Sequence, residues 1–279
     1  MSDRHTSVFT DTSFESFKDK VELKSFLDEM ADKYNTPQFI SDDPVSVPHG
    51  FSNKEDIEIS AFLTASISWG NRKAILKGAN EMMRLMDHQP HAFVMGHSKH
   101  ELKSLEKFVY RTFNGIDFRQ FVASLQHVYS RHGGLEELFT VKMKDQLNPG
   151  MAISEFRNRF FEKNQSARTS KHVADPLRGS SAKRINMFLR WMVRDDQRGV
   201  DFGIWKSISP SQLSIPLDVH TGNVARRLGL LERKQNDWKA VEELDKALRS
   251  FNAIDPVQYD FALFGLGAIG KFQFTNNIY

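Results

Sequence analysis

The sequence contains no cysteine among its 279 residues. Disulfides, thiol nucleophiles, thiolate zinc sites and iron–sulfur clusters are therefore excluded as features of this chain. Apolar runs long enough to span a bilayer are also missing, and the first 20 residues lack the apolar segment of a secretory signal peptide. We therefore expect a cytoplasmic protein that has no membrane partner.

Hydrophobic residues make up 40% of the chain and charged residues 26%, as in an ordinary globular protein of one large domain or two small ones. The net charge of +3 is unevenly distributed. Residues 1–60 contain 6 Lys and Arg against 13 Asp and Glu, a net charge of −7, whereas residues 178–239 contain 12 against 6, a net charge of +6. A basic segment of this kind suits a polyanion such as DNA or RNA, although a solvated helix face gives the same excess.

Helical periodicity runs through almost the whole chain. In residues 183–194, apolar side chains recur at the spacing of one buried helix face, with Ile185, Phe188 and Leu189 among them. Further helices are expected at Glu58–Trp69, Arg72–Met86, Phe118–Tyr129, Leu135–Met143, Ser154–Phe161, Asp218–Leu230, Trp238–Phe251 and Asp255–Ile269. Strand-like alternation is nearly absent, and only Val45–Phe51 is plausible as a short extended stretch. The pattern predicts an all-α protein.

A Gly-Ser-Ser turn precedes the helix that begins at Lys183. Such a turn leaves backbone N–H groups free at the start of the helix, and these groups bind phosphate. Ser180 or Ser181 is predicted to cap the helix. Taken alone, the pattern is more typical of a surface lysine.

An aspartate, Asp218, stands before a second basic helix, in the sequence IPLDVH at residues 215–220. Taken alone, an aspartate beside a helix N-terminus is most often an N-cap. Together, however, Lys183 and Asp218 place an amine and a carboxylate at two helix starts with arginines around them. This combination is able to carry out chemistry on a nucleic-acid sugar.

In this order, the two elements resemble the helix-hairpin-helix DNA glycosylase superfamily. The hairpin of that family reads roughly L-P-G-h-G-x-K-x-A-N, and PLRGSSAKRIN at residues 176–186 places Gly179, Lys183 and Asn186 on its glycine, lysine and asparagine. The family's aspartate segment is matched by residues 217–220 and 224–230. The PLDVH motif is especially similar to the 8-oxoguanine glycosylase branch, and the LDVHTG core is also similar to a family of uncharacterised proteins.

Several residues depart from the family pattern. Ser181 replaces the second hairpin glycine, and Lys183 and Asp218 are 35 positions apart, where most of the family has a much shorter spacing. We interpret Arg194–Ser214 as an insertion that loops out and leaves the two helix starts adjacent. Asp260 stands where the 8-oxoguanine enzymes have glutamine, and the absence of cysteine excludes the cluster of endonuclease III and the adenine glycosylases.

The resemblance implies a bilobal all-α fold with a cleft between two helical lobes. A single glycosylase-like unit would cover residues 1–279. Within it, we expect a helical lobe at about 50–170, the helix-hairpin-helix and the aspartate segment at 175–235, and C-terminal helices at 236–279.

The resemblance also implies a monomeric DNA glycosylase with AP lyase activity in base excision repair. Its partner would be double-stranded DNA that contains a damaged base, preferably an oxidised purine. Asp218 would stabilise the positive charge that builds on the sugar, and the partly neutral amine of Lys183 would attack the anomeric carbon. No cofactor and no metal is expected for this chemistry, although the hairpin carbonyls could hold a monovalent cation, as in relatives.

SWGNRKAI at residues 68–75 is also similar to the segment of the 8-oxoguanine glycosylase branch that fills the gap left by a flipped base. These matches, together with the basic residues around them, predict the contacts to DNA. The residues expected to bind DNA are Gly179, Ser180, Ser181, Arg184, Trp69, Asn71, Arg72, His220 and Arg226. Trp69 or Asn71 would fill the gap that a flipped base leaves, unless Trp69 is a core residue. Asp260 and Phe264, four residues apart on one helix face, would form the base pocket, unless Phe264 is core and Asp260 is a helix cap.

Two other functions fit the same residues. One is a non-catalytic helix-hairpin-helix module that binds DNA or RNA, in which Lys183 and Asp218 do not closely face each other. The other is an all-helical protein–protein adaptor in which both residues are caps. The distance between the Lys183 and Asp218 side chains therefore distinguishes the glycosylase from these two alternatives.

Overall fold

The computed structural model describes residues 17–145, 148–163 and 166–269, with side chains omitted at 141–145. The expected all-α class is confirmed, because within these ranges the strands are a two-residue antiparallel hairpin, β1 (Val109–Tyr110) with β2 (Phe113–Asn114). No helix in the described part of the chain is both long and apolar enough to cross a membrane. The expected unit of residues 1–279 includes 1–16 and 270–279, which lie outside the described residues.

The helices follow one another with short connections. In chain order they are α1 (Lys20–Tyr34), η1 (Pro37–Asp42), η2 (Pro44–Ser46), η3 (Pro48–Gly50), α2 (Lys54–Ser66), α3 (Arg72–Leu85), α4 (Pro90–Gly96), α5 (Lys99–Ser104), η4 (Leu105–Lys107), α6 (Gly115–Arg131), α7 (Leu135–Asp145), α8 (Pro149–Phe160), α9 (Ala167–Ser170), η5 (Pro176–Arg178), α10 (Lys183–Val193), η6 (Pro210–Gln212), α11 (Val219–Arg227), α12 (Trp238–Phe251), η7 (Pro256–Gln258), α13 (Tyr259–Phe264) and the π-helical turn η8 (Gly265–Ile269).

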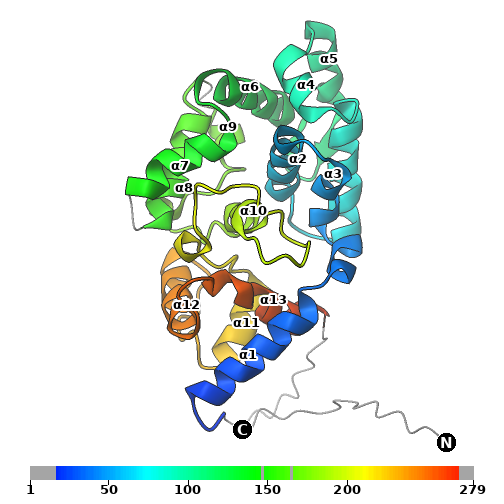
Figure 1. Cartoon of the computed structure of the whole chain (residues 1–279). Coiled ribbons are helices and arrows are strands. Elements are labelled where there is room, and N and C mark those ends of the chain that lie inside the picture. Colours follow the sequence, from blue (N-terminus) through cyan, green and yellow to red (C-terminus); the bar gives the residue numbers. More distant parts are fainter. Residues whose placement is uncertain (1–16, 146–147, 164–165, 270–279) are drawn as a thin grey trace, which may run out of the picture.

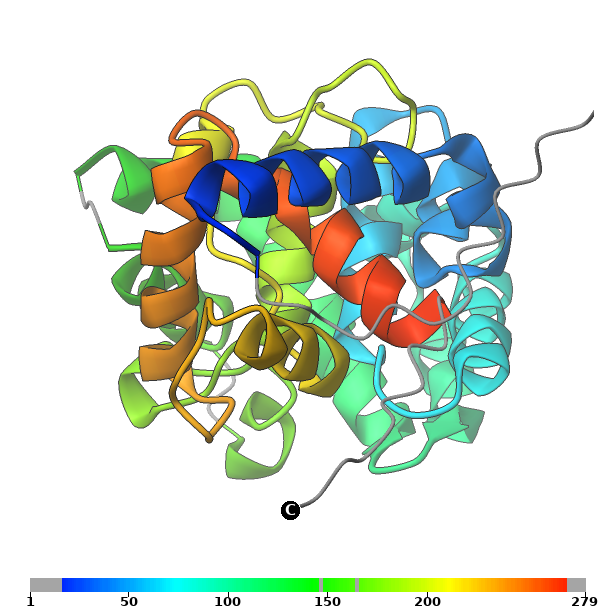
Figure 2. The same ribbon diagram turned by 90° about the horizontal axis from the view of Figure 1, so that it is seen from below.

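Helix α10 lies between two groups of helices (Figure 1). It packs against α2, which belongs to the group α2–α9, while α1, α11, α12 and α13 gather at the other end. Within that second group, α13 packs against both α1 and α11, and Figure 2 shows α1 running across α13. Segments from the two ends of the chain thus meet beside the central helix.

An aromatic cluster holds α10 against the first group of helices. Phe62 of α2 lies at its centre, with ring centroids 5.1–5.8 Å from those of Phe121, Phe156, Phe160 and Phe188. These rings come from α6, α8 and α10, and all are buried. Edge-to-face and offset aromatic pairs add to the stability that apolar burial provides, so this cluster fixes the position of α10.

Helix α10 is buried all round, not only on its predicted apolar stripe. Every residue from 185 to 193 is buried, including Arg190. The charge of Arg190 is neutralised within the protein, because its guanidinium pairs with Asp201 and Asp260. Arg194 pairs in the same way with Asp201, at 3.3 Å. Part of the basic excess of residues 178–239 is therefore internal and not available to a polyanion.

The prediction that Arg194–Ser214 loops out is wrong. The segment folds back on α10, where Phe202 donates its backbone N–H to the carbonyl of Trp191 at 2.7 Å. The Trp205 side chain is fully buried, and its indole N–H donates to the Glu58 carboxylate at 2.7 Å. The segment folds back because it places the Trp205 side chain in the hydrophobic core.

Two further predictions of local structure are wrong in detail. Val45–Phe51 is not extended, because Pro44 and Pro48 fix a φ that suits the 3₁₀ turns η2 and η3. The helix expected at Asp255–Ile269 is divided into η7, α13 and the π-helical turn η8. The sequence analysis also did not identify α1, α4, α5 or the small hairpin.

Candidate active site

The turn before α10 is built from left-handed residues. Gly179 has a φ of 87° and Ala182 a φ of 48°. Ala182 is the N-cap residue and makes no side-chain cap, so the prediction that a serine caps this helix is wrong. Ser180 instead accepts a hydrogen bond from the Ala182 N–H at 3.2 Å, and Asn186 donates to the carbonyl of Ser181 at 3.2 Å. These two bonds stabilise the turn from both sides.

The segment that carries Asp218 is tied to this turn. Asp218 is the N-cap of α11, since its Oδ1 accepts from the Thr221 N–H at 2.9 Å. The Ser181 hydroxyl donates to the carbonyl of Leu217 at 3.3 Å, and Asn236 donates to the carbonyl of Asp218 at 3.1 Å. The starts of α10 and α11 are therefore adjacent, as predicted.

Lys183 and Asp218 face each other across this junction. The distance from Lys183 Nζ to Asp218 Oδ2 is 3.9 Å, and the two side chains are 25% and 22% exposed. The predicted proximity of these side chains is confirmed. The Lys183 ammonium also donates to a weak acceptor, the Met187 thioether sulfur, at 3.5 Å. The amine is thus close to a carboxylate, in a partly desolvated position, without a short bond that would immobilise it.

Both residues line a pocket with a volume of about 760 Å³. This volume lies within the range of pockets that bind small molecules. Its walls come from η1 and η2, the connection from α2 to α3, α10, the start of α11, and α13 with η8. The aromatic residues among its lining are Phe39, Trp69, Trp191, His220 and Phe264. The pocket wall therefore combines aromatic rings with the partly exposed side chains of Lys183 and Asp218.

Three charged side chains form a polar part of the pocket wall. Asp43, Arg190 and Asp260 all line the pocket and are almost fully buried. Arg190 donates to Asp260, and burial nevertheless raises the pKa of Asp260 to about 6. Burial likewise raises the pKa of Asp43, whose Oδ1 accepts from the Val45 N–H at 3.0 Å. These side chains offer both hydrogen-bond donors and acceptors to a ligand.

Asp43 was not identified from the sequence. Its only local signal is its position before Pro44, which is also the pattern of an ordinary turn. Asp260 was identified, and the alternative that it caps a helix is wrong, because it lies inside α13 and pairs with Arg190. Phe261 is a core residue, whereas Phe264 is half-buried and lines the pocket.

Trp69 forms one wall of the pocket and is half-buried. The Arg184 guanidinium lies 4.9 Å from the centre of its ring and donates to the carbonyl of Ser66. Tyr110 donates its hydroxyl to the Trp69 carbonyl at 2.6 Å. Burial lowers the pKa of Arg184 to about 10. Arg184 therefore contacts the Trp69 ring and itself lines the pocket.

Three other residues expected to contact DNA lie at or near the pocket mouth. Asn71 is exposed and caps α3, because its side chain accepts from the Ala74 N–H at 3.2 Å. Arg72 lines the pocket and lies 5.8 Å from the centre of the Phe264 ring. His220 is exposed and approaches the same ring edge-on, with centroids 6.3 Å apart. The pocket mouth thus carries a cation, an imidazole and an amide.

Of the remaining expected contacts, Ser181 lines the pocket, whereas Gly179, Ser180 and Arg226 do not. Arg226 donates to the carbonyl of Arg233 at 2.8 Å and to the Asn236 side chain at 2.6 Å, so it supports the chain after α11. Gly179 is exposed, but its carbonyl accepts from the Trp238 N–H at 3.1 Å. Ser180 forms an isolated β-bridge with Asp237, whereas Ser181 lines the pocket.

Comparison with known proteins gives one match. Residues 43–269 match the family described as Protein of unknown function (DUF2400), and this range contains both Lys183 and Asp218. No curated protein and no solved structure matches the chain. The description of the family specifies no activity, so the chemistry has to be argued from the pocket.

Proposed function

We propose that this chain, which belongs to the DUF2400 family, is a DNA glycosylase with AP lyase activity. The geometry of its pocket supports this function. The fold is then a bilobal helix-hairpin-helix arrangement in which the turn at 179–182 is the hairpin and the pocket is the cleft. The substrate is double-stranded DNA that contains a damaged base, with an oxidised purine as the preferred lesion.

The observation that carries the proposal is the 3.9 Å separation of Lys183 Nζ from Asp218 Oδ2 in a pocket. As the glycosidic bond breaks, the base leaves with the bonding electrons and positive charge builds on the sugar. The Asp218 carboxylate stabilises this charge, and the Lys183 amine bonds to the anomeric carbon. The bond from that carbon to the ring oxygen then breaks, the oxygen takes up a proton, and a Schiff base forms. Loss of a proton from the neighbouring carbon eliminates the 3′ phosphate and cuts the strand. A non-catalytic module or an adaptor requires no such pairing.

The pocket walls fit an extruded base. Phe264 offers an aromatic ring for stacking, which is how base-flipping enzymes hold their target. The carboxylates of Asp43 and Asp260 accept hydrogen bonds from ring N–H groups, while Arg190 donates to carbonyl oxygens. An oxidised purine carries one more N–H on its imidazole ring than the parent base, so it suits a pocket with two buried carboxyl groups.

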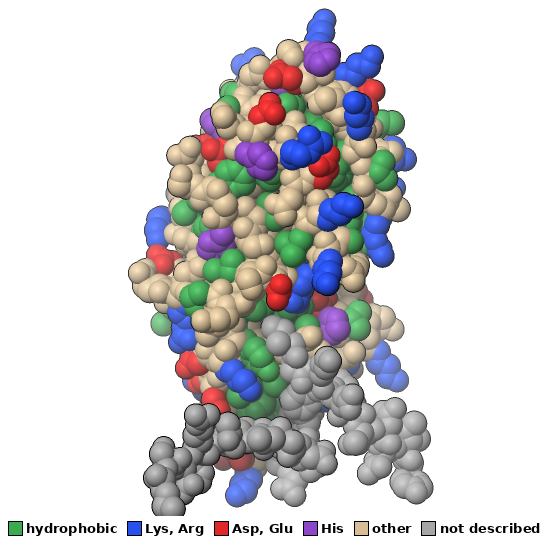
Figure 3. Space-filling model, turned by 90° about the vertical axis from the view of Figure 1, so that its right-hand side faces the viewer, with side chains coloured by type: hydrophobic (Ala, Val, Ile, Leu, Met, Phe, Trp, Pro, Cys, Tyr) green, Lys and Arg blue, Asp and Glu red, His purple; other side chains and the backbone are tan. Residues whose placement is uncertain are grey.

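Basic side chains beside the pocket mouth would contact the phosphates of the duplex. Lys73 and Lys77 are exposed on α3, whose first residue, Arg72, lines the pocket. Figure 3 shows the side of the molecule on which α3 lies, with Lys and Arg side chains spread over the surface. Phosphate contacts of this kind position a protein on DNA without reading its sequence.

Borohydride trapping on a panel of oligonucleotides with damaged bases tests this function. We expect a covalent adduct with an oxidised-purine duplex, abolished by Lys183→Gln and retained by Lys171→Gln, an exposed lysine outside the pocket. Duplex affinity should be similar for both variants, because each removes one charge. Duplex binding without an adduct on any lesion would favour the non-catalytic module, and an adduct that persists in Lys183→Gln would move the chemistry to another amine.

A further inference from the structure

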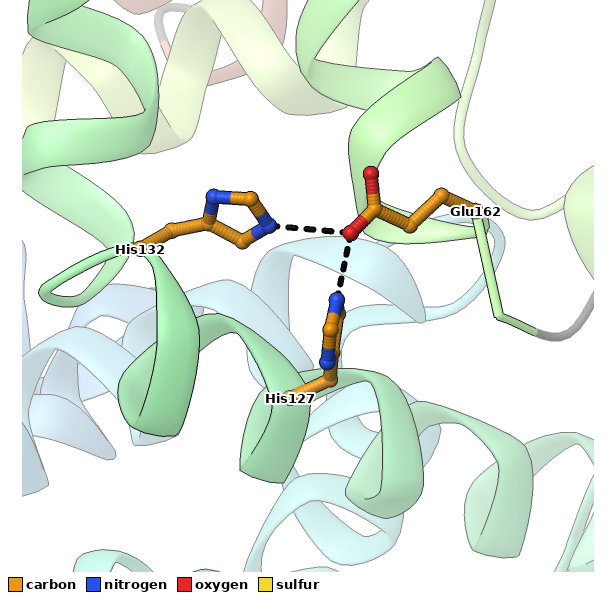
Figure 4. Close-up of side chains that lie close together, drawn as sticks. All are labelled: His127, His132 and Glu162. Atoms are coloured by element: carbon orange, nitrogen blue, oxygen red, sulfur yellow. Dashed lines mark hydrogen bonds and ion pairs between the residues drawn. The ribbon is translucent and has the colours of Figure 1, made fainter.

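Two histidines and a glutamate converge on the surface where α6 and α8 end. The Nε2 atoms of His127 and His132 both contact Oε1 of Glu162, the second at 3.0 Å (Figure 4). The two imidazole rings are nearly perpendicular, with centroids 5.2 Å apart. The three ligand atoms lie within 4.8 Å of one another. The cluster therefore points three good metal ligands at one small volume.

The backbone around the cluster is well supported. His127 lies in the last turns of α6, and His132 is the C-cap residue of that helix, with its N–H bonded to the carbonyl of Val128 at 2.8 Å. Glu162 follows α8 closely. Beneath the cluster the two helices are packed together, with the rings of Phe121 and Phe160 5.2 Å apart. The ligands thus belong to two rigid elements whose relative position is already fixed.

One of the ligand spacings already suits a metal ion. With metal–ligand distances of about 2.0–2.1 Å, neighbouring ligand atoms of a tetrahedral zinc site lie roughly 3.3 Å apart. The observed 3.0 Å between His132 Nε2 and Glu162 Oε1 is close to that spacing. The separation of the histidines, four residues between them, also matches the spacing of paired histidines in zinc sites.

We propose that His127, His132 and Glu162 bind a divalent transition-metal ion of the zinc class. Imidazole and carboxylate ligands suit Zn²⁺, whereas Mg²⁺ and Ca²⁺ prefer oxygen ligands alone. The ion replaces the two N–H protons that the carboxylate now accepts, and solvent occupies the remaining position. None of the three residues lines the pocket, so the ion clamps α6 to α8, and this inference does not rest on the proposed function.

One feature of the cluster limits the affinity. His127 Nδ1 is buried, and no hydrogen-bond partner for it lies in the described residues. When Nε2 binds a metal, Nδ1 carries the imidazole proton, and zinc-bound histidines normally donate that proton to an oxygen. We therefore expect binding weaker than that of a four-ligand structural zinc site, and a single ion per chain.

Metal titration of the full chain, prepared without a histidine tag and stripped with a chelator, tests the site. Calorimetry with ZnCl₂ should show one ion per chain, Co²⁺ should give the intense visible bands of tetrahedral coordination, and Zn²⁺ should raise the melting temperature. His132→Gln and Glu162→Gln should each weaken Zn²⁺ binding about tenfold or more. His100→Gln, which removes an exposed histidine on α5, should leave it unchanged.

The chelator-treated variants are compared by their melting temperatures without metal, which separates loss of a ligand from loss of the fold. The site is disproved if the chain binds no stoichiometric Zn²⁺. It is equally disproved if His132→Gln and His100→Gln bind with the same affinity, or if Co²⁺ shows only the weak bands of its octahedral aqua ion.

Discussion

Asp218 meets Lys183 with one carboxylate oxygen and caps α11 with the other. Oδ2 lies 3.9 Å from the lysine nitrogen, while Oδ1 accepts the Thr221 N–H at 2.9 Å. The cap holds the carboxylate in a fixed orientation at the positive end of α11. If positive charge develops beside Oδ2, this oxygen therefore stabilises the charge without having to reorient.

Asp218→Asn should keep the N-cap of α11 and remove the negative charge that the proposed chemistry requires. Asparagine is as good an N-cap as aspartate, so the melting temperature should change little. A neutral amide cannot stabilise a developing cation, so we expect single-turnover base excision to slow by about 10²–10³-fold. Asp237→Asn, at the N-cap of α12, is the matched control and should excise at the normal rate. Equal rates for the two variants would remove Asp218 from the mechanism.

Phe264→Ala should weaken recognition of the damaged base. Its half-buried ring lines the pocket beside Arg72 and His220. Because stacking contributes about 1–3 kcal/mol per base, we expect excision of the preferred lesion to fall about 5–150-fold. Affinity for undamaged duplex, measured by fluorescence anisotropy, should stay almost constant. Equal losses in both assays would mean that Phe264 supports the fold.

Arg190→Met should destabilise the protein strongly. It leaves Asp201 and Asp260 buried without their shared cation, and breaking a buried ion pair in this way costs about 3–5 kcal/mol. Adding Asp260→Asn to Arg190→Met should recover part of that loss, because one uncompensated carboxylate is removed. Urea unfolding of the single and double variants measures both effects, and additive losses would show that Arg190 and Asp260 are not coupled.

His172 should make stability depend on pH. Burial lowers its pKa to about 4, whereas an unfolded histidine has a pKa of about 6.5. As the pH falls from about 6.5 to 4, the unfolded chain takes up a proton that the folded chain refuses. The free energy of unfolding therefore decreases over that window, by at most about 3 kcal/mol.

His172→Gln should flatten the pH dependence of stability by a similar amount, because glutamine does not titrate. Urea unfolding between pH 7 and pH 4, compared for the two proteins, isolates this contribution from that of the carboxyl groups. Parallel curves would show that His172 carries no proton-linked stability. Because His172 stacks on Trp69, with centroids 6.0 Å apart, the same titration should alter the tryptophan fluorescence.

The parts that could be predicted from the sequence are those set by local patterns. The boundaries of α10 and α12 follow from amphipathic periodicity, and the junction of Lys183 with Asp218 follows from two motifs in order. The contribution of Asp43 could not be predicted, because only the packing of η2 against α2 and α3 brings it to the pocket. Long-range contacts of this kind leave no local signature.

The roles of the arginines show the same limit. Arg184 and Arg226 each stand in a motif that predicts DNA binding, and the structure adds a contact that the motifs do not predict, because each donates to a backbone carbonyl, that of Ser66 or of Arg233. The sequence does not distinguish an arginine whose guanidinium donates to a backbone carbonyl from an arginine that binds a phosphate. Only the fold determines which acceptor is within reach.

The connection between Lys183 and Asp218 affects the folding of the chain. The two residues are 35 positions apart in the sequence. The Trp205 N–H donates to the Met192 carbonyl at 2.9 Å, so the segment that follows α10 returns to the end of that helix. Each doubling of a flexible loop costs only about 0.6 kcal/mol in closure entropy. Within that segment, the exposed residues 197–199 should therefore tolerate changes in length, whereas Asp201 is held by Arg190 and Arg194. The lysine and the aspartate should still meet when the exposed turn is shortened or extended.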